Sequence, residues 1–416
     1  MEILLYFLII SSFWGANIVN ISLGEVHLTF FRLLLIILVV LLIIFKGNKF
    51  IIFNKGNRYS IVFITLWLIW GIFSFYWSID IKNWLRNIYF IFIGLITIII
   101  MNNIVCDKET LIKCIYAYQC GLIIQILIGW YEIFTKNYCF ATVNNAFINY
   151  YILRDHRIPI AMCGNPNNFA TLMFIGVFIS YTCIKNSRMI IFKALNTCAF
   201  ISSIILIYQT ESRANIIGLI MSLLFIVIIG KKATWKSICL KSITLCVAGL
   251  YLGYRALGKI KDMLIIGTNS DIVRINLLKN GLYFLKDTFG LGVGAGQIES
   301  WISLKSVYDT QGILNMHNWW GEILVAYGTI IFVGYLLFYL KLFNDNLQRY
   351  RISTIPEFKS VMLAICAILI GFSIASVSSS SNSTSESLWV FWSICIVWQG
   401  VIKRQTVYGG LSKCLE

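Results

Sequence analysis

Long apolar runs recur along the whole chain, and they constrain its fold more than any other feature of the sequence. A helix needs about 20 apolar residues to cross the roughly 30 Å hydrocarbon core of a bilayer. Twelve stretches meet or approach that length, at residues 3–19, 28–45, 60–77, 87–105, 111–134, 166–184, 189–208, 214–230, 237–254, 318–342, 360–377 and 387–403. We therefore expect an all-α, polytopic integral membrane protein with about twelve transmembrane helices.

The composition argues against a water-soluble protein. Of the 416 residues, 59% are hydrophobic and only 12% are charged, whereas about a quarter of the residues in soluble domains are charged. Only 3 prolines occur, and the apolar runs are too continuous for the alternating strands of an outer-membrane barrel. A single membrane domain covering residues 1–416 is expected.

Basic residues identify the loops expected in the cytoplasm, because Lys and Arg are enriched on that side of transmembrane helices. They gather after the second, sixth, eighth and tenth spans and in the C-terminal tail. These residues are Lys46, Lys49, Lys55, Arg58, Lys185, Arg188, Lys193, Lys231, Lys232, Lys236, Lys241, Lys341, Arg349, Arg351, Lys359, Lys403 and Arg404. All fall on one side if twelve spans alternate, which places both termini in the cytoplasm. Topology and lipid headgroups thus account for the net charge of +16, and no nucleic-acid partner is expected.

The N-terminus and the cysteines carry two smaller predictions. Apolar residues follow Met1 almost at once, with no basic segment before them, so the first span is expected to be retained. The 12 cysteines show no metal-ligand spacing, so neither a metal nor another cofactor is expected. Cys139 and Cys163 are the cysteines expected outside the cell, and the sequence leaves open whether they pair.

Two long gaps between spans fall on the outer face in this topology, at about 135–165 and 255–317. Residues 255–317 form a large extracytoplasmic loop, and such loops are uncommon unless they carry function or their own helices. Asp271 to Lys286 keeps a helical apolar period, which predicts an amphipathic helix at the membrane surface. Its apolar stripe consists of Ile272, Ile275, Leu278, Leu282 and Leu285.

Two arginines are expected on the outer side, where the enrichment of cations in the cytoplasm does not explain them. Arg213 lies at the outer end of a span, and Arg274 lies in the large loop. A guanidinium presents a planar, permanently charged fork that suits phosphate oxygens. The alternative for each is a structural salt bridge, with Glu211 and Asp271 respectively.

His317, one of 3 histidines, is expected at the outer mouth of a span. An imidazole takes or gives a proton near neutral pH, so it suits a general base. Asn318 follows it directly, and Glu322 lies a little over one helical turn further along. The alternative is a hydrogen-bonded surface histidine, but the two outer arginines favour a site.

A glycine-rich segment, Gly290 to Gly296, precedes His317 in the large loop. Gly292, Gly294 and Gly296 recur at every second position, and glycines permit positive φ angles and a close approach of the backbone to a ligand. A dinucleotide-binding loop is disfavoured, because no strand precedes the segment and it is expected outside the cell. The glycines are therefore candidates for substrate binding.

Amide side chains open the span at 166–184. Asn165 precedes a proline and is followed by Asn167 and Asn168, a pattern typical of a capped helix start. The same amides could instead face a sugar. A serine-rich turn at residues 378–385 has the same two interpretations, as a flexible connector or as a source of hydroxyl donors.

Basic residues also lie just before that span. Arg154 and Arg157 flank His156 on the same outer loop. They could attract a pyrophosphate headgroup, or merely the phosphates of membrane lipids.

Together these segments resemble the O-antigen ligase and polymerase superfamily of bacterial envelope glycan assembly. The resemblance rests on residues 165–171, 212–214 and 274–296, and on His317-Asn318 followed by Glu322 and Gly328. It covers about residues 160–345 by motif. The amide-rich and His-Asn-Trp-Trp segments look more like capsule, exopolysaccharide or teichuronic acid polymerases.

The resemblance implies a metal-independent, inverting glycosyltransferase that uses an undecaprenyl-diphosphate-linked glycan as donor at the outer face of the cytoplasmic membrane. A polymerase would transfer the glycan to another lipid-linked repeat unit, with a chain-length regulator as a possible partner. A ligase would transfer it to lipid A-core. Arg213 and Arg274 would bind the diphosphate, and His317 would orient or deprotonate the acceptor hydroxyl. The remaining candidates for substrate binding are Arg154, Arg157, Asn165, Asn167, Asn168, Asn318, Glu322, Gly292, Gly294 and Gly296.

A transporter or flippase is the alternative from a different class. Twelve spans with both termini inside is also a common plan for transporters. Transporters tend to place polar groups near the bilayer midplane, whereas here the charged candidates cluster at the outer face.

Overall fold

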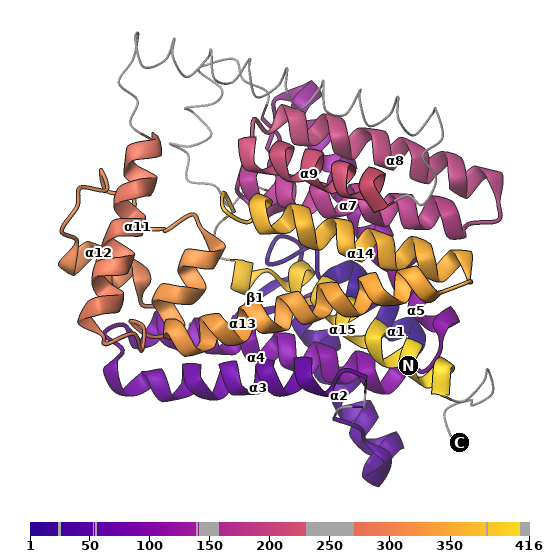
Figure 1. The fold of residues 1–416 in the computed structure, drawn as a ribbon, viewed down its shortest axis with the longest axis horizontal. Coiled ribbons are helices and arrows are strands. Elements are labelled where there is room, and N and C mark those ends of the chain that lie inside the picture. The colour runs from indigo at the N-terminus through magenta and orange to yellow at the C-terminus, as the bar shows by residue number, and fades with distance from the viewer. Residues whose placement is uncertain are drawn as a thin grey trace.

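A computed structural model describes residues 1–23, 26–52, 54, 56–138, 140, 158–229, 270–379 and 382–407 (Figure 1). The predicted span at 237–254 lies outside these residues. So do the candidates Arg154 and Arg157, together with His156 and Cys139.

Helices make up nearly all of the regular structure in this part of the chain. They are α1 (Glu2–Ser11), α2 (Phe30–Lys46), α3 (Arg58–Phe73), α4 (Ile81–Ile104), α5 (Lys108–Thr135), α7 (Pro166–Asn186), α8 (Ile190–Gln209), α9 (Arg213–Ile229), α11 (Ser270–Asp287), α12 (Ile298–Lys305), α13 (Trp319–Ile352), α14 (Pro356–Ala375) and α15 (Glu386–Val407). Every predicted span except 237–254 corresponds to one of them. Among the described residues, 7 helices are long and apolar enough to cross a membrane. The all-α, polytopic membrane fold is confirmed.

The first predicted span, at 3–19, is too long. Helix α1 ends at Ser11, where the hydroxyls of Ser11 and Ser12 donate to the carbonyls of Leu8 and Ile9. Such side-chain hydrogen bonds compete with the helical ladder. The chain then forms a short antiparallel hairpin of β1 (Asn20–Leu23) and β2 (Val26–Thr29), which the sequence analysis missed.

The helix predicted in the large loop is confirmed as α11, and its place at the membrane surface stays a prediction. Its apolar stripe, including Ile272, Ile275 and Leu282, stays about half exposed. The opposite face carries Val273 and Leu277, which are buried in the protein. The helix thus packs on the protein through one face and leaves the other apolar face open.

Close helix packing in the bundle depends on small residues. Gly218 of α9 faces Gly371 of α14, and a Cβ atom on Gly218 would lie 2.6 Å from the Gly371 carbonyl oxygen. Ser222, one turn further along α9, donates to the Ala367 carbonyl at 2.6 Å. Small residues and interhelical hydrogen bonds of this kind hold membrane helices together. The hydrophobic effect does not drive helices together in a bilayer, because lipid tails are as apolar as the helix surfaces.

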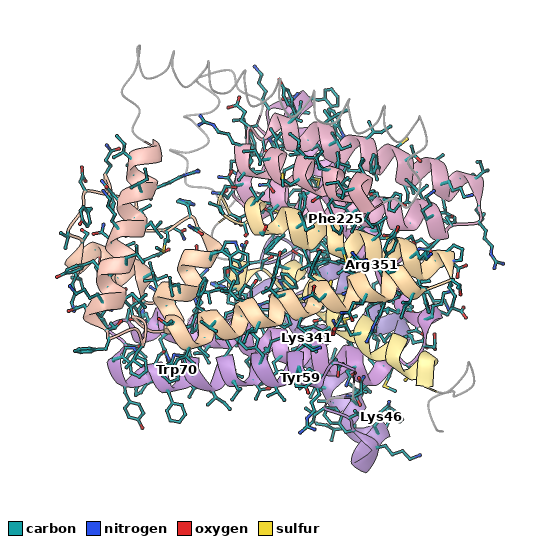
Figure 2. The ribbon with its side chains drawn as sticks, in the orientation of Figure 1. Lys46, Tyr59, Trp70, Phe225, Lys341 and Arg351 are labelled. Carbon is teal, nitrogen blue, oxygen red and sulfur yellow. The ribbon has the colours of Figure 1, made fainter. Side chains whose placement is uncertain are left out.

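Several described segments that carry basic residues lie at one end of the bundle. Lys108, the first residue of α5, pairs with Glu357 at the start of α14, and Lys46 at the end of α2 donates to the Asn103 carbonyl at 2.6 Å. Lys46 and Arg351 lie in the half of the molecule away from α11 and α12, whereas Trp70 lies on their side (Figure 2).

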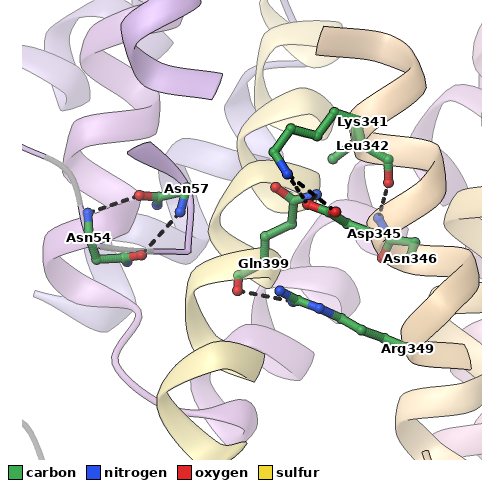
Figure 3. Close-up of polar contacts among 8 residues, drawn as sticks. All are labelled: Asn54, Asn57, Lys341, Leu342, Asp345, Asn346, Arg349 and Gln399. Carbon is green, nitrogen blue, oxygen red and sulfur yellow. Dashed lines mark hydrogen bonds and ion pairs between the residues drawn. The ribbon is translucent and has the colours of Figure 1, made fainter. Parts of the chain in front are cut away.

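A polar network joins α13 to α15 at this same end (Figure 3). Asp345 accepts from Lys341 at 3.0 Å and from the Gln399 amide at 3.5 Å. Arg349 donates to the Gln399 carbonyl at 3.1 Å. The network fixes the last turns of α13 against α15.

The glycine-rich segment docks onto a break in α13 at the other end of the molecule. Gly328 has φ 80° and ψ 178°, which interrupts the helix. Val293 N donates to Val325 O at 2.8 Å, Gly294 N to Ala326 O at 2.9 Å, and Thr329 N to Gly290 O at 2.9 Å. The loop therefore satisfies backbone groups that the break leaves without helical partners.

Gly328→Ala tests this docking, with Gly312→Ala as the matched control. Both glycines have positive φ, but a Cβ on Gly312 would meet nothing within 4 Å, whereas one on Gly328 would overlap the backbone of Gly290 and Leu291. Backbone strain alone costs about 1–3 kcal/mol. We expect Gly328→Ala to lower the apparent Tm in detergent by about 5 °C or more beyond the control. Equal melting of the two variants would contradict the docking.

Candidate functional site

A large cavity opens among the ends of α2, α4, α7 and α15. Its volume is about 790 Å³. Charged residues from three helix ends and the turn before α4 line it, together with hydroxyl and amide side chains. The polar lining includes Arg32, Asp80, Lys82, Asn83, Arg86, Asn168, Thr171, Asn382, Thr384, Ser385, Glu386 and Ser387. Such a wall suits a polar ligand with many hydrogen-bonding groups.

A smaller cavity of about 110 Å³ adjoins the large one. The two share Asn83, Arg86 and Thr384 in their walls. Glu322 and Asn315 line the smaller cavity, so it reaches the segment that carries His317. The two cavities thus form one polar region that reaches residues on both sides of His317, although His317 itself lines neither cavity.

His317 sits in a constrained position just before α13. Its φ is +47°, its backbone N–H donates to the Asn315 side chain at 2.9 Å, and its Nδ1 is buried without a hydrogen-bond partner in the described structure. Burial lowers the pKa of His317, and the positive charge of Arg274 lowers it further. The imidazole therefore stays neutral to a lower pH than a free histidine, as a general base requires.

Asn318 caps the helix that follows. Its side-chain oxygen accepts from Gly321 N at 3.3 Å, so it fixes the start of α13 next to His317. Glu322, in the first turn of that helix, reaches the smaller cavity.

The two arginines expected on the outer side, Arg213 and Arg274, have different surroundings. Arg274, on the exposed surface of α11, is close enough to His317 to act on its charge. Arg213 begins α9 and is also exposed. Neither lines the two cavities described above.

Contacts beside Arg213 connect it to two other predicted segments. Ser212 lies 3.3 Å, Oγ to Oγ, from Ser378 of the serine-rich turn. Asn215 donates to Ser212 Oγ at 2.9 Å and to the Asn167 carbonyl at 3.5 Å. The structure thus brings Arg213, the start of α7 and the serine-rich turn together.

The asparagines at the start of α7 have different positions: one caps the helix and another lines the large cavity. Asn165 caps the helix by accepting from Asn167 N at 2.8 Å and Asn168 N at 3.4 Å. Asn168 lines the large cavity. Just upstream, buried Glu132 accepts from the backbone of Ile160 and Ala161, at 2.8 Å each, and holds this segment against α5.

The predicted glycines mainly serve close packing of the chain on itself. A Cβ on Gly292 would lie 2.5 Å from Gly328 N, and one on Gly294 would lie 3.1 Å from the Gln297 side chain. Of the three candidates, Gly296 reaches a cavity wall, that of the smaller cavity. Positive φ angles occur at all three, as the sequence predicted.

Three cations of the large cavity were missed in the sequence. Lys82 and Arg86 lie between two predicted spans, on the side expected to be outer, and Arg32 lies within a predicted span. Arg213 and Arg274 were singled out as cations on the side expected to be outer. The same criterion applies to Lys82 and Arg86. The serine-rich turn also contributes to the cavity, which favours its interpretation as a source of hydroxyl groups.

Two further predictions concern cysteines and metals. Cys163 lines the large cavity and carries a free thiol. Cys139, with which the sequence left a pairing open, lies outside the described residues. Over the described ranges, no three His, Cys, Asp or Glu side chains gather closely enough to hold a metal ion.

Comparison with known proteins gives two matches. Residues 198–339 match a family model described as O-antigen ligase, and this range contains Arg213, Arg274 and His317. The chain is 27% identical over 417 residues to the teichuronic acid biosynthesis protein TuaE of Bacillus subtilis (strain 168), covering 94% of this chain and 83% of that protein. The predicted resemblance to the O-antigen ligase and polymerase superfamily is confirmed. Both matches support an envelope-polysaccharide function for this multi-pass membrane protein.

The pH dependence of activity tests the electrostatic link between Arg274 and His317. Removing the nearby positive charge raises the pKa of His317, so Arg274→Gln should move the acid limb of the pH–rate profile to higher pH. The control is Lys279→Gln, which removes a cation from the same helix that does not act on His317. The rate of glycan transfer that remains in isolated membranes is measured against pH for the native protein and both variants. An acid limb that stays in place in Arg274→Gln would contradict the link.

Proposed function

We propose that this protein is a membrane glycosyltransferase that polymerises undecaprenyl-diphosphate-linked oligosaccharide repeat units on the outer face of the cytoplasmic membrane. The observation that carries the proposal is the buried, unpartnered Nδ1 of His317 beside Arg274, next to a polar cavity system. The family match over the same residues supports it. Both termini would lie in the cytoplasm, at the end of the bundle where several basic segments lie.

The proposed reaction is a single displacement at the anomeric carbon of the donor glycan. His317 accepts the proton of the acceptor hydroxyl, the acceptor oxygen bonds to the anomeric carbon, and the bond to the diphosphate oxygen breaks. Arg213 and Arg274 stabilise the negative charge that builds on the departing undecaprenyl diphosphate. A single displacement inverts the configuration at that carbon. The diphosphate is already a good leaving group, so the mechanism needs neither a metal nor another cofactor.

A ligase that transfers the glycan to lipid A-core or another acceptor is the second candidate. The description of the matching family, O-antigen ligase, favours it. The relative TuaE takes part, by its name, in teichuronic acid biosynthesis. This supports a polymerase as the first candidate. The two candidates share the same donor chemistry and differ in the acceptor.

Substitution of the three candidate residues tests the proposal in cells that lack the native protein. We expect His317→Ala, Arg274→Ala and Arg213→Ala each to reduce long surface glycan by about 100-fold or more, because each removes a group that acts on the transition state. Surface glycan length on a gel and protein level in the membrane are measured together.

Arg188→Ala is the matched control, since Arg188 is an exposed arginine between α7 and α8, at the end of the bundle away from the site. Surface glycan of normal length in cells with a stably inserted His317→Ala variant would contradict the proposal. If the native protein joins single repeat units to an acceptor and makes no chains of several units, the ligase is favoured instead.

A further inference from the structure

One residue in the wall of the large cavity has a buried carboxylate oxygen without a hydrogen-bond partner in the described structure. Glu386, the first residue of α15, lines this cavity and is only 6% exposed. Its Oε1 accepts from Arg32 Nε at 2.8 Å. Its Oε2 is buried and accepts no hydrogen bond from any residue that the structure describes. A buried acceptor that is left unpaired destabilises the protein, so its presence calls for an explanation.

Arg32 holds Glu386 in place and is itself held from several sides. Its Nη1 donates to the His27 carbonyl. The guanidinium carbon lies 5.0 Å from the ring centre of Tyr89 and 5.1 Å from that of Phe90. The Thr29 side chain accepts from its backbone N–H at 3.3 Å. These contacts fix the orientation of the carboxylate at the cavity wall.

The charge balance around Glu386 favours a neutral hydrogen-bond donor as its missing partner. Arg32 already compensates the charge of Glu386, and Lys82 and Arg86 outnumber Asp80 in the rest of the wall. A further cation would be repelled by this net positive charge. A hydroxyl group donates one hydrogen bond without adding charge.

The rest of the wall suits a ligand that carries many hydroxyls. Asn168, Thr171, Thr384 and Ser385 supply amide and hydroxyl groups, which both donate and accept. A volume of about 790 Å³ lies within the usual range of small-molecule sites, about 300–1,000 Å³. Sugars combine this size with this density of hydroxyl groups.

We propose that the large cavity is a glycan-binding site in which Glu386 Oε2 accepts a hydrogen bond from a sugar hydroxyl. The proposal rests on the proposed function, because it takes the lipid-linked glycan as the substrate of this chain. The hydroxyl comes either from the donor glycan or from the acceptor glycan, and the experiment below separates these sources.

The direct test measures binding of a lipid-free probe to the purified full-length protein in detergent. The probe is the oligosaccharide that mild acid releases from the lipid-linked repeat units of the host, so it lacks both lipid and diphosphate. Glu386→Gln keeps the size of the side chain and an oxygen for Arg32, but it replaces Oε2 by an NH₂ group. We expect it to weaken probe binding about tenfold or more, because a charge-assisted hydrogen bond is lost.

Glu357→Gln is the matched control, since Glu357 is also paired with a basic residue but lies at the opposite end of the bundle. It should bind the probe as the native protein does. Glu386→Gln should melt at a lower temperature than the native protein, because it leaves buried Arg32 without its counter-charge. Probe binding is therefore measured well below the melting temperature of the variant.

Turnover measurements distinguish donor from acceptor. With intact lipid-linked units as donor and the released oligosaccharide as added acceptor, an increased KM for the oligosaccharide alone assigns Glu386 to the acceptor glycan. An increased KM for the lipid-linked unit alone assigns it to the donor glycan. A folded Glu386→Gln variant with native probe affinity and native KM values would overturn the proposal and leave a water molecule as the partner of Oε2.

Ala16→Phe provides a second variant that leaves the Arg32–Glu386 pair untouched. Ala16 lines the same cavity, and a phenyl ring there would fill part of it. If Glu386→Gln does not fold, loss of probe binding by folded Ala16→Phe supports the site, and native binding overturns it. Failure of the proposed function is recognised separately: the native protein would then bind the probe through Glu386 and yet lengthen no glycan.

Discussion

The docking of residues 290–296 onto the break in α13 is the constraint on which the rest of the structure depends. A helix broken within a membrane leaves backbone groups that neither lipid nor its own helix satisfies. Here Val325 O and Ala326 O accept from the glycine segment, and Thr329 N donates back to it. The close approach needs glycine at both Gly292 and Gly328, because a Cβ on either would overlap the opposing backbone. The large loop is therefore fixed to the helix that begins two residues after His317.

The same docking connects the loop to the cavities. Gln297, directly after the glycine segment, accepts from Ile79 N at 2.8 Å and Asp80 N at 2.7 Å, and donates to the Asp80 carbonyl at 2.7 Å. These contacts hold the start of α4, whose Asn83 and Arg86 line both cavities. The docked glycine segment and the Gln297 side chain that follows it thus link the break in α13 to the start of α4.

Sequence patterns predicted the helices well, since apolar spans and helix caps are local features. Helix α11 and the cap at Asn165 follow from such features. The roles of Arg213, Arg274 and His317 stay predictions. The helix break at Gly328 was not predictable, because it is stabilised by a loop more than 30 residues earlier in the chain. Arg32 was hidden within an apolar run, and its partner Glu386 is 354 positions away. Only the tertiary fold brings such pairs together.

The central claim is that this site joins lipid-linked repeat units, and glycan transfer by the purified protein tests it most directly. The protein is reconstituted in proteoliposomes with lipid-linked repeat units from its host, and the products are resolved by mass spectrometry. We predict lipid-linked oligomers of increasing length together with free undecaprenyl diphosphate, neither of which forms with His317→Ala. Repeat units that stay single, whether unchanged or moved across the membrane, would contradict the account.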